Sequence, residues 1–433
     1  MADPATLVSR LRETWRRTDA LFELIQPDAL LERPIPLRHP FLFYLGHLPA
    51  FAWNQVCRGA LGRESFAPEL DALFERGIDP SDVRGFAAPD TRWPGMAETL
   101  EYRDRVRDAL VVMSGEAVER DAAHVLERAI EHELMHQETL LYMTLQLPHD
   151  RKRPPEAAAP SPRRGAAAAG SVEVPAGPVT LGAPRNGAFG WDNEFPEREL
   201  RVPAFRVDAL PVRNGEFLEF VEAGGYHTPE LWTPEAWAWR EAQRHDCPRL
   251  WSRREGEWVY RTLFEDVPLA DVADWPVYVT WAAARAYARW RARRLATEAE
   301  YQRAAHADPA GELRSHPWGE AAPTGEHGNF GFRAWTPTPV GTHPAGASAW
   351  GVQDLVGDGW EWTATPFGPH PGFEPMPGYE GYSSDFFDGR HYVLLGASWA
   401  TDDSLVRRSF RNWFQPHYPY VFAKFRCAKD AAA

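Results

Sequence analysis

The sequence of 433 residues predicts a protein of class α + (α+β), in which a helical bundle precedes a separate domain of mixed helices and strands. Two observations support this prediction. Apolar residues recur at helical spacing up to residue 147, whereas beyond residue 171 the periodic segments become short and mixed. The 19 tryptophans are also unevenly placed, because only Trp15, Trp53 and Trp93 precede residue 150. The two halves of the chain are therefore built differently.

Residues 1–148 are expected to form the helical bundle. Helical spacing predicts four helices in the segments 5–25, 41–61, 97–113 and 121–147. The second segment is almost wholly apolar and should lie inside the bundle, and the last stops before Pro148, which cannot continue a helix. Four helices joined by short and medium connections favour an up-and-down bundle, whose core is a common place for metal ligands from facing helices.

Residues 149–170 are rich in proline, alanine and arginine and contain no large apolar residue, which is typical of a linker. Residues 171–430 are expected to form the second domain. Strand-like patterns occupy 172–182, 199–212, 257–263, 391–400 and 422–428, and helical patterns occupy 214–225 and 279–305. Asp388 and Gly389 form a pair suited to a tight turn.

Composition excludes several classes of protein. The formal net charge of −14 argues against nucleic-acid binding, because no overall positive field attracts phosphates. Three scattered cysteines are too few for a disulfide framework or a cysteine-based zinc site. The first helix has no secretory h-region, and no apolar run is long enough to span a membrane. We therefore expect a soluble, cytoplasmic protein.

A possible metal site lies in the segment "IEHELMHQETLLYM", residues 130–143. On a helix, His132 and His136 project from one face and can bind one ion. The pattern H-E-x-x-H is also that of zinc peptidases, in which Glu133 would act as general base. That hypothesis needs a third ligand in a specific downstream position, and no suitable histidine or glutamate follows within the helix.

A third histidine, His47, stands in the otherwise apolar segment "FLFYLGHLPAFAW". We interpret it as a partner for the two histidines on the neighbouring helix, with His124 a poorer candidate. Three neutral imidazoles with open positions suit catalytic zinc or Fe(II), and the pattern alone does not decide between these metals. Glu133 or Glu138 as a further carboxylate ligand stays open.

The second half of the chain carries four segments that resemble those of the formylglycine-generating-enzyme/sulfatase-modifying-factor fold, a C-type-lectin-like α+β domain. They are "RLATEAEYQRAA" (294–305), "WGVQDLVGDGWEWTATPF" (350–367), "LLGASWATDD" (394–403) and "SFRNWFQPHYPYVFAKFRC" (409–427). The first half resembles a DinB-like four-helix bundle, in which "FYLGH" and "HELMHQE" match the places that supply a three-histidine iron site. The combination is similar to the ergothioneine sulfoxide synthase family, whose relatives include the ovothiol-pathway sulfoxide synthase and selenoneine synthase.

This resemblance implies that His47, His132 and His136 are iron ligands. It also implies an enzyme that uses Fe(II) and O2 to join a thiol or selenol donor to C2 of the imidazole of hercynine, Nα-trimethylhistidine. In relatives that make sulfoxides, the sulfur is oxygenated as well. Hercynine and the donor would be the small-molecule partners, and neither nucleic acid nor a membrane is expected.

The resemblance further implies substrate contacts in the second domain. In the family, the asparagine of the R-N-W segment lies beside the quaternary ammonium group, and here that residue is Asn412. Trp413, Phe414 and Trp399 are candidates for aromatic faces that attract the same cation, and core packing is the alternative for both tryptophans.

Two tyrosines lie where relatives carry a tyrosine that delivers a proton. They are Tyr379 and Tyr382, in "PGYEGYSSDFF", and packing of a loop is the alternative role for them.

Two departures from the family pattern concern the donor. Mycobacterial-type members have a glutamine before the last histidine and an acid after R-N-W, where this chain has Met135 and Phe414. Both changes argue against γ-glutamylcysteine. Arg84 and Arg92 are candidates for holding a donor carboxylate. Cysteine in an ergothioneine enzyme and a selenosugar in a selenoneine synthase both stay open.

Two further functions are alternatives to this one. Formylglycine generation needs a reactive cysteine pair, and only Cys247 and Cys427 are available, far apart in the sequence. A lectin-like binding module with a vestigial metal site is the alternative that is not an enzyme. Retention of the three histidines and of "FRNWF" argues against it.

Overall fold

The computed structural model describes residues 3–75, 92–120, 122–155 and 170–431. The chain divides into two compact units, of which unit 1 is Met1–Glu156 and unit 2 is Ala157–Ala433. Within the described residues, we find no helix that combines the length and the apolar character needed to cross a membrane.

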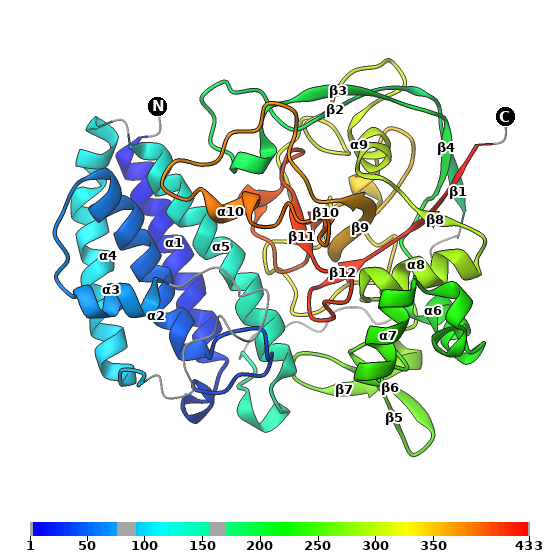
Figure 1. Cartoon of the computed structure of the whole chain (residues 1–433), viewed down its shortest axis with the longest axis horizontal. Coiled ribbons are helices and arrows are strands. Elements are labelled where there is room, and N and C mark those ends of the chain that lie inside the picture. The colour runs from blue at the N-terminus through cyan, green and yellow to red at the C-terminus, as the bar shows by residue number, and fades with distance from the viewer. Residues whose placement is uncertain (1–2, 76–91, 121, 156–169, 432–433) are drawn as a thin grey trace. The chain divides into compact units, whose positions relative to one another are not determined.

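Unit 1 is a bundle of helices (Figure 1). Its α-helices are α1 (Pro4–Glu23), α2 (Phe41–Ala52), α3 (Pro68–Phe74), α4 (Met96–Glu119) and α5 (Ala123–Gln146). Helix α1 packs against α5, and α2 packs against both α4 and α5. The four long helices confirm the predicted bundle, whereas the short α3 was not predicted.

Local sequence explains the ends of these helices. Helix α1 begins at Pro4, whose fixed backbone suits a first helical position, and the Asp3 carboxylate accepts a hydrogen bond from the Thr6 amide at 3.2 Å. All residues of α2 are buried, as its apolar sequence requires. The chain then continues as a π-helix from Trp53 to Ala60. A histidine in such a helix lies where no water can solvate it.

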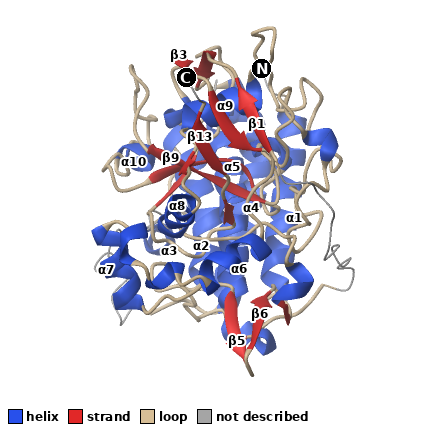
Figure 2. Cartoon of the chain, turned by 90° about the vertical axis from the view of Figure 1, so that its right-hand side faces the viewer, coloured by secondary structure: helices blue, strands red, loops and turns tan. Residues whose placement is uncertain are grey.

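Unit 2 mixes short helices with short strands, as predicted (Figure 2). Its helices are α6 (Asn214–Glu222), α7 (Pro234–Gln243), α8 (Trp281–Trp290), α9 (Glu298–His306) and α10 (Gly381–Ser384). Its strands are β1 (Ser171–Val174), β2 (Gly177–Leu181), β3 (Arg198–Val202), β4 (Phe205–Asp208), β5 (Trp251–Arg254), β6 (Glu257–Arg261), β7 (Asp266–Pro268), β8 (Arg294–Leu295), β9 (Gly359–Pro366), β10 (Tyr392–Ala397), β11 (Asn412–Phe414), β12 (Ala423–Lys424) and β13 (Cys427–Asp430).

The strands of unit 2 form two four-stranded sheets, a three-stranded sheet and a hairpin. One four-stranded sheet has the order β1-β4-β13-β8 and the other has the order β11-β10-β9-β12. Strands β5, β6 and β7 form the third sheet, and β2 pairs with β3. A core cluster that includes Phe205, Tyr301, Phe367 and Val393 draws residues from both four-stranded sheets and from α9. Strand β11 is an edge strand, so one side of it makes no pairing within its sheet.

The single helix predicted over residues 279–305 is wrong. The chain instead forms α8, the short strand β8 and then α9. Ala292 follows the end of α8 with a φ of 51°, a left-handed conformation that stops a helix. Thr297 then begins α9, because its side chain accepts a hydrogen bond from the Glu300 amide while the Glu300 side chain bonds back to the Thr297 amide. Local capping therefore overrides the continuous helical pattern.

A buried ion pair joins distant segments of unit 2. The Arg426 guanidinium contacts the Glu361 carboxylate through two hydrogen bonds, of 2.7 Å from Nε and 2.9 Å from Nη2. The two side chains are 1% and 2% exposed. Glu361 belongs to β9, and Arg426 lies between β12 and β13, so the pair ties the segments that build both four-stranded sheets.

Candidate functional site

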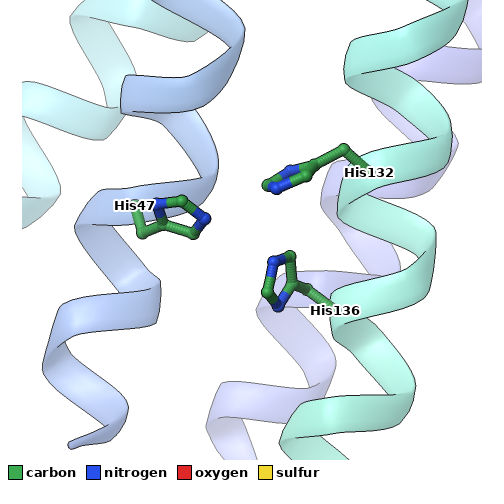
Figure 3. Close-up of side chains that lie close together, drawn as sticks. All are labelled: His47, His132 and His136. Atoms are coloured by element: carbon green, nitrogen blue, oxygen red, sulfur yellow. The ribbon is translucent and has the colours of Figure 1, made fainter. Parts of the chain in front are cut away.

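Three histidines from two helices of unit 1 converge on one point (Figure 3). His47 projects from α2, and His132 and His136 project from successive turns of α5. One ligand nitrogen can be chosen from each ring so that all three lie within 4.8 Å of one another. This spacing matches what three imidazoles need to bind a single metal ion.

A backbone carbonyl fixes the orientation of His47. Its Nδ1 lies 2.7 Å from the carbonyl oxygen of Phe74, at the end of α3. A carbonyl only accepts hydrogen bonds, so Nδ1 carries the proton and Nε2 presents a lone pair. Nε2 is buried and has no hydrogen-bond partner among the described residues. This arrangement is the usual one for a metal-binding histidine.

Stacking, rather than a hydrogen bond, orients His132. Its ring lies 3.6 Å from the ring of Phe51, and the two planes differ by 9°. Both of its ring nitrogens are buried without a partner in the described structure, as is Nδ1 of His136. Tyr44 packs beside His136 at a centroid distance of 5.5 Å. Buried nitrogens of this kind are costly unless something binds them.

Burial keeps all three imidazoles neutral. It lowers the pKa of His47 to about 4, although the hydrogen bond with Phe74 partly opposes this shift. It also lowers the pKa of His132 and of His136 well below the usual value, and the neighbouring histidines lower both further. Neutral imidazole is the form that binds a metal, so the three residues fit a catalytic ion such as iron or zinc.

Glu133 does not belong to this cluster. Its carboxylate accepts a hydrogen bond of 2.6 Å from the Thr18 hydroxyl of α1, and it lies 4.0 Å from the Arg107 guanidinium. Burial raises its pKa, while Arg107 and Thr18 oppose the shift. The glutamate that makes the segment resemble a peptidase therefore serves the packing of α5 against its neighbours.

Two other candidates from the first half lie within the described residues. Met135 is half-buried on α5, directly before His136, and Arg92 is exposed in the segment before α4. Arg84 lies outside the described residues.

In unit 2, the structure brings together Tyr379, Tyr382 and Trp413. The rings of the two tyrosines lie 5.4 Å apart. Tyr382 meets Trp413 edge-on at 5.3 Å, with an interplanar angle of 79°. Trp413 in turn stacks on Phe367 at 4.2 Å. All three candidate side chains are half-buried, so part of each is accessible.

Asn412 and Phe414 lie on the other face of their strand. Strand β11 pairs with β10 in the register Leu394–Asn412 and Tyr392–Phe414. Because side chains alternate along a strand, Asn412 and Phe414 point away from the face that Trp413 occupies. Phe414 stacks on Tyr418 at 5.0 Å, and the Asn412 side chain accepts a hydrogen bond from the Trp413 amide at 2.9 Å.

Trp399 lies apart from Trp413 and the two tyrosines, and apart from Asn412 and Phe414. Its side chain is 2% exposed, and its ring packs against Phe422 at 4.7 Å. Trp399 therefore packs in the core of unit 2.

The structure also shows residues that sequence reasoning did not find. Phe51 and the Phe74 carbonyl orient the histidines, and a buried stretch from Trp191 to Glu194 holds the loops that carry the candidate tyrosines and Trp413. Asp192 and Asn193 are buried polar residues in a short 3-10 helix, Asp192–Glu194, and no pattern in the sequence marks them.

Comparison with known proteins identifies both halves of the chain. Residues 10–140 match the DinB superfamily, and residues 156–431 match the sulfatase-modifying factor enzyme 1-like domain. Hercynine oxygenase of Mycolicibacterium smegmatis is 36% identical over 98% of this chain and 99% of its own length. Ergothioneine biosynthesis protein 1 of Neurospora crassa is 30% identical over 96% of this chain and 57% of its own length.

The second half alone is similar to a further class of enzyme. A formylglycine-generating enzyme of Mycobacterium tuberculosis is 34% identical over 44% of this chain and 72% of its own length. The hercynine oxygenase, in contrast, aligns with both halves. These likenesses confirm the predicted fold class and the predicted resemblance. The chain belongs to the family of the hercynine oxygenases, in which a DinB-superfamily helical bundle precedes a sulfatase-modifying factor enzyme 1-like domain.

Proposed function

We propose that this protein is a nonheme Fe(II)- and O2-dependent enzyme that joins a thiol or selenol donor to C2 of the hercynine imidazole. The observation that carries the proposal is the buried cluster of His47, His132 and His136, whose neutral rings present unpartnered nitrogens to one point. Full-length similarity to a protein named hercynine oxygenase supports the choice of substrate and of an oxygen-dependent reaction.

The ligand set is suited to such chemistry. Three neutral imidazoles leave other coordination positions open, and a bound Fe(II) ion would supply the redox reactivity toward O2 that zinc lacks. For a sulfoxide product, the reaction balances as follows. The C2–H and S–H bonds break, C–S and S–O bonds form, and the second oxygen atom of O2 leaves as water.

Side chains of unit 2 would bind and orient hercynine. The ring of Trp413 would attract the trimethylammonium group, contributing about 1 kcal/mol. We assign proton delivery to Tyr379 or Tyr382, since a phenol can donate a proton to a developing anion. Asn412 stays a candidate contact on the other face of β11, and Trp399 is left out because it is buried.

The donor would be one other than γ-glutamylcysteine. Phe414 and Met135 stand where mycobacterial-type members carry an acid and a glutamine, and that acid helps to hold the amino group of γ-glutamylcysteine. This disfavours γ-glutamylcysteine and leaves cysteine and a selenosugar as the two donor candidates, hence an ergothioneine-type or a selenoneine-type product. Arg92 and Arg84 stay candidates for holding a donor carboxylate.

Two measurements test this function. Anaerobic loading should give one Fe(II) per chain, and occupancy below about a tenth of an equivalent contradicts the metal assignment. The loaded enzyme should then consume O2 only when hercynine and a donor are both present. Mass analysis of the product after competition among cysteine, γ-glutamylcysteine and a selenosugar identifies the donor.

Matched variants on one helix make the test specific. His132→Ala should abolish iron binding and O2 consumption, because it removes a ligand. His124→Ala, an exposed histidine on the same helix, should leave both unchanged. Equal effects of the two substitutions would reject the ligand assignment.

The alternative functions find little support in the structure. A zinc peptidase needs Glu133 beside the metal, and that carboxylate bonds to Thr18 instead. Formylglycine generation needs reactive thiols, whereas burial raises the pKa of Cys247 to about 11 and raises that of Cys427 as well. A binding module would have no use for three neutral imidazoles with unpartnered nitrogens.

A further inference from the structure

We propose that Asp192 is a positioning residue that clamps the loop carrying Tyr379 and Tyr382. This inference rests on the proposed function, in which one of these tyrosines delivers a proton. It adds a residue, in a segment far away in the sequence, whose carboxylate holds the tyrosines where that function needs them.

One carboxylate binds both ends of the loop. Asp192 Oδ2 accepts a hydrogen bond of 3.3 Å from the Met376 amide. Asp192 Oδ1 accepts a short hydrogen bond from the Ser383 hydroxyl. Tyr379 and Tyr382 lie between these two anchor points. Because Asp192 is 3% exposed, its bonds form away from water, where they are strongest.

The neighbouring residues complete the clamp. The Asn193 amide group donates to the Ser383 oxygen at 3.0 Å, which leaves the Ser383 proton committed to Asp192. Trp191 stacks on Tyr382 at 4.1 Å, with planes 28° apart. The tyrosine ring is therefore held from its own loop and from the stretch that contains Asp192.

The same stretch also holds the segment that contains Trp413. The Asn193 carbonyl accepts a hydrogen bond of 3.2 Å from Arg411 Nη1. Glu194 accepts hydrogen bonds from Arg407 at 2.9 Å and from Ser409 at 2.6 Å. Side chains and carbonyls within 191–194 thus fix two segments whose aromatic rings meet at Tyr382 and Trp413. Asp192 contacts the tyrosine loop at both of its ends.

Asp192→Asn removes the charge but keeps the shape. An amide cannot accept two hydrogen bonds through both of its end atoms, so one anchor of the loop is lost. We expect kcat to fall by about 10-fold or more, while KM for hercynine changes less than about 2-fold, because the substrate contacts proposed on Trp413 remain. Iron content should stay at the wild-type value. A folded variant that keeps the wild-type kcat, whether or not its KM for hercynine changes, overturns the proposal.

A double-mutant cycle separates positioning from general stability. Tyr379→Phe and Tyr382→Phe identify the tyrosine that matters, and Asp192→Asn is then added to that variant. If Asp192 acts through the tyrosine, the second change should cost less than about 2-fold in kcat. If the fall in kcat of the double variant equals the product of the falls in the two single variants, the proposal is contradicted. Asp354→Asn is the matched control. Asp354 is also a buried carboxylate, and it accepts a hydrogen bond of 2.6 Å from the Gly341 amide elsewhere in unit 2.

Hydrogen exchange tests the clamp without any assay of activity. In the substrate-free protein, amides of 376–386 should exchange at least about 10-fold faster in Asp192→Asn than in wild type, and those of α9 should not change. Unchanged protection of 376–386 overturns the clamp even if the enzyme is active. If wild type shows no hercynine-dependent turnover, the proposed function fails, and this exchange result still decides whether the clamp exists.

Discussion

The rings of Phe51 and His132 stack at 3.6 Å with their planes 9° apart, so a metal-ligand candidate takes its orientation from an apolar side chain. His47, in contrast, is fixed by its hydrogen bond with the Phe74 carbonyl. The two ligands thus depend on different interactions, which mutations can separate.

Phe51→Leu should weaken Fe(II) binding by roughly 10-fold, because His132 loses the flat surface that aligns it. Titration with Fe(II) under anaerobic conditions measures the change. Phe41→Leu is the control, since Phe41 is fully buried in the same helix, α2, and is 0% exposed. Equal losses of affinity in the two variants would show that the stack with His132 has no special role.

The metal-free protein should lose stability as the pH falls from 6.5 toward 4. The pKa of His47 is about 4 in the folded state, against an ordinary value of 6.5, so the unfolded state binds more protons in this range. Each histidine whose pKa is lowered in this way should reduce the free energy of unfolding by about 1.4 kcal/mol for each unit that the pH falls within this range.

Other buried histidines add to this slope, so His47→Gln isolates one contribution. Urea unfolding measures the free energy of unfolding of the metal-free proteins at pH 7 and at pH 5. Between these pH values, the variant should lose about 2 kcal/mol less of that free energy than wild type loses. Parallel pH profiles for the two proteins would mean that folding does not lower the pKa of His47.

Glu133→Gln should keep iron binding, and hercynine-dependent O2 consumption should stay within about 3-fold of wild type. The carbonyl of glutamine can still accept the Thr18 hydrogen bond, and only the attraction to Arg107 is lost. If Glu133 were a general base, the loss would be about 100-fold or more. Steady-state O2 uptake distinguishes the two outcomes.

Glu361→Ala should destabilise unit 2 by about 3–5 kcal/mol, because it leaves the buried Arg426 charge unpaired. Asp403→Ala offers a control, since Asp403 pairs with Arg333 at the surface, where both side chains are about 40% exposed, and its loss should cost about 0–1 kcal/mol. Thermal unfolding of the two variants compares these costs. The iron content of Glu361→Ala should not change, because the histidines belong to unit 1.

Sequence patterns captured the class of fold and the histidines because both follow from regular spacing. Helical periodicity placed His132 and His136 on one face, and the apolar setting of His47 marked it as unusual. The same periodicity failed where local geometry intervenes. The turn at Ala292 has no strong signal in the sequence, and it divides a predicted helix into α8 and α9.

Interactions across the chain were beyond such patterns. The Phe74 carbonyl is a backbone group, so no residue type announces its bond to His47. Asp192 contacts Ser383 across a long stretch of sequence, and only the folded chain brings them together. Trp413 and Phe414 face opposite sides because side chains alternate along a strand, but which side each one takes depends on the register of β11, which residue identities do not reveal.

The position of β11 at the edge of its sheet bears on how this family can diversify. An edge strand and the loops around it tolerate substitution more readily than the interior of a bundle does, because fewer neighbours must adjust. Phe414 and the tyrosine loop belong to unit 2, whereas the three histidines stand on α2 and α5 of unit 1. Selection can therefore change these positions without replacing any of the three histidines.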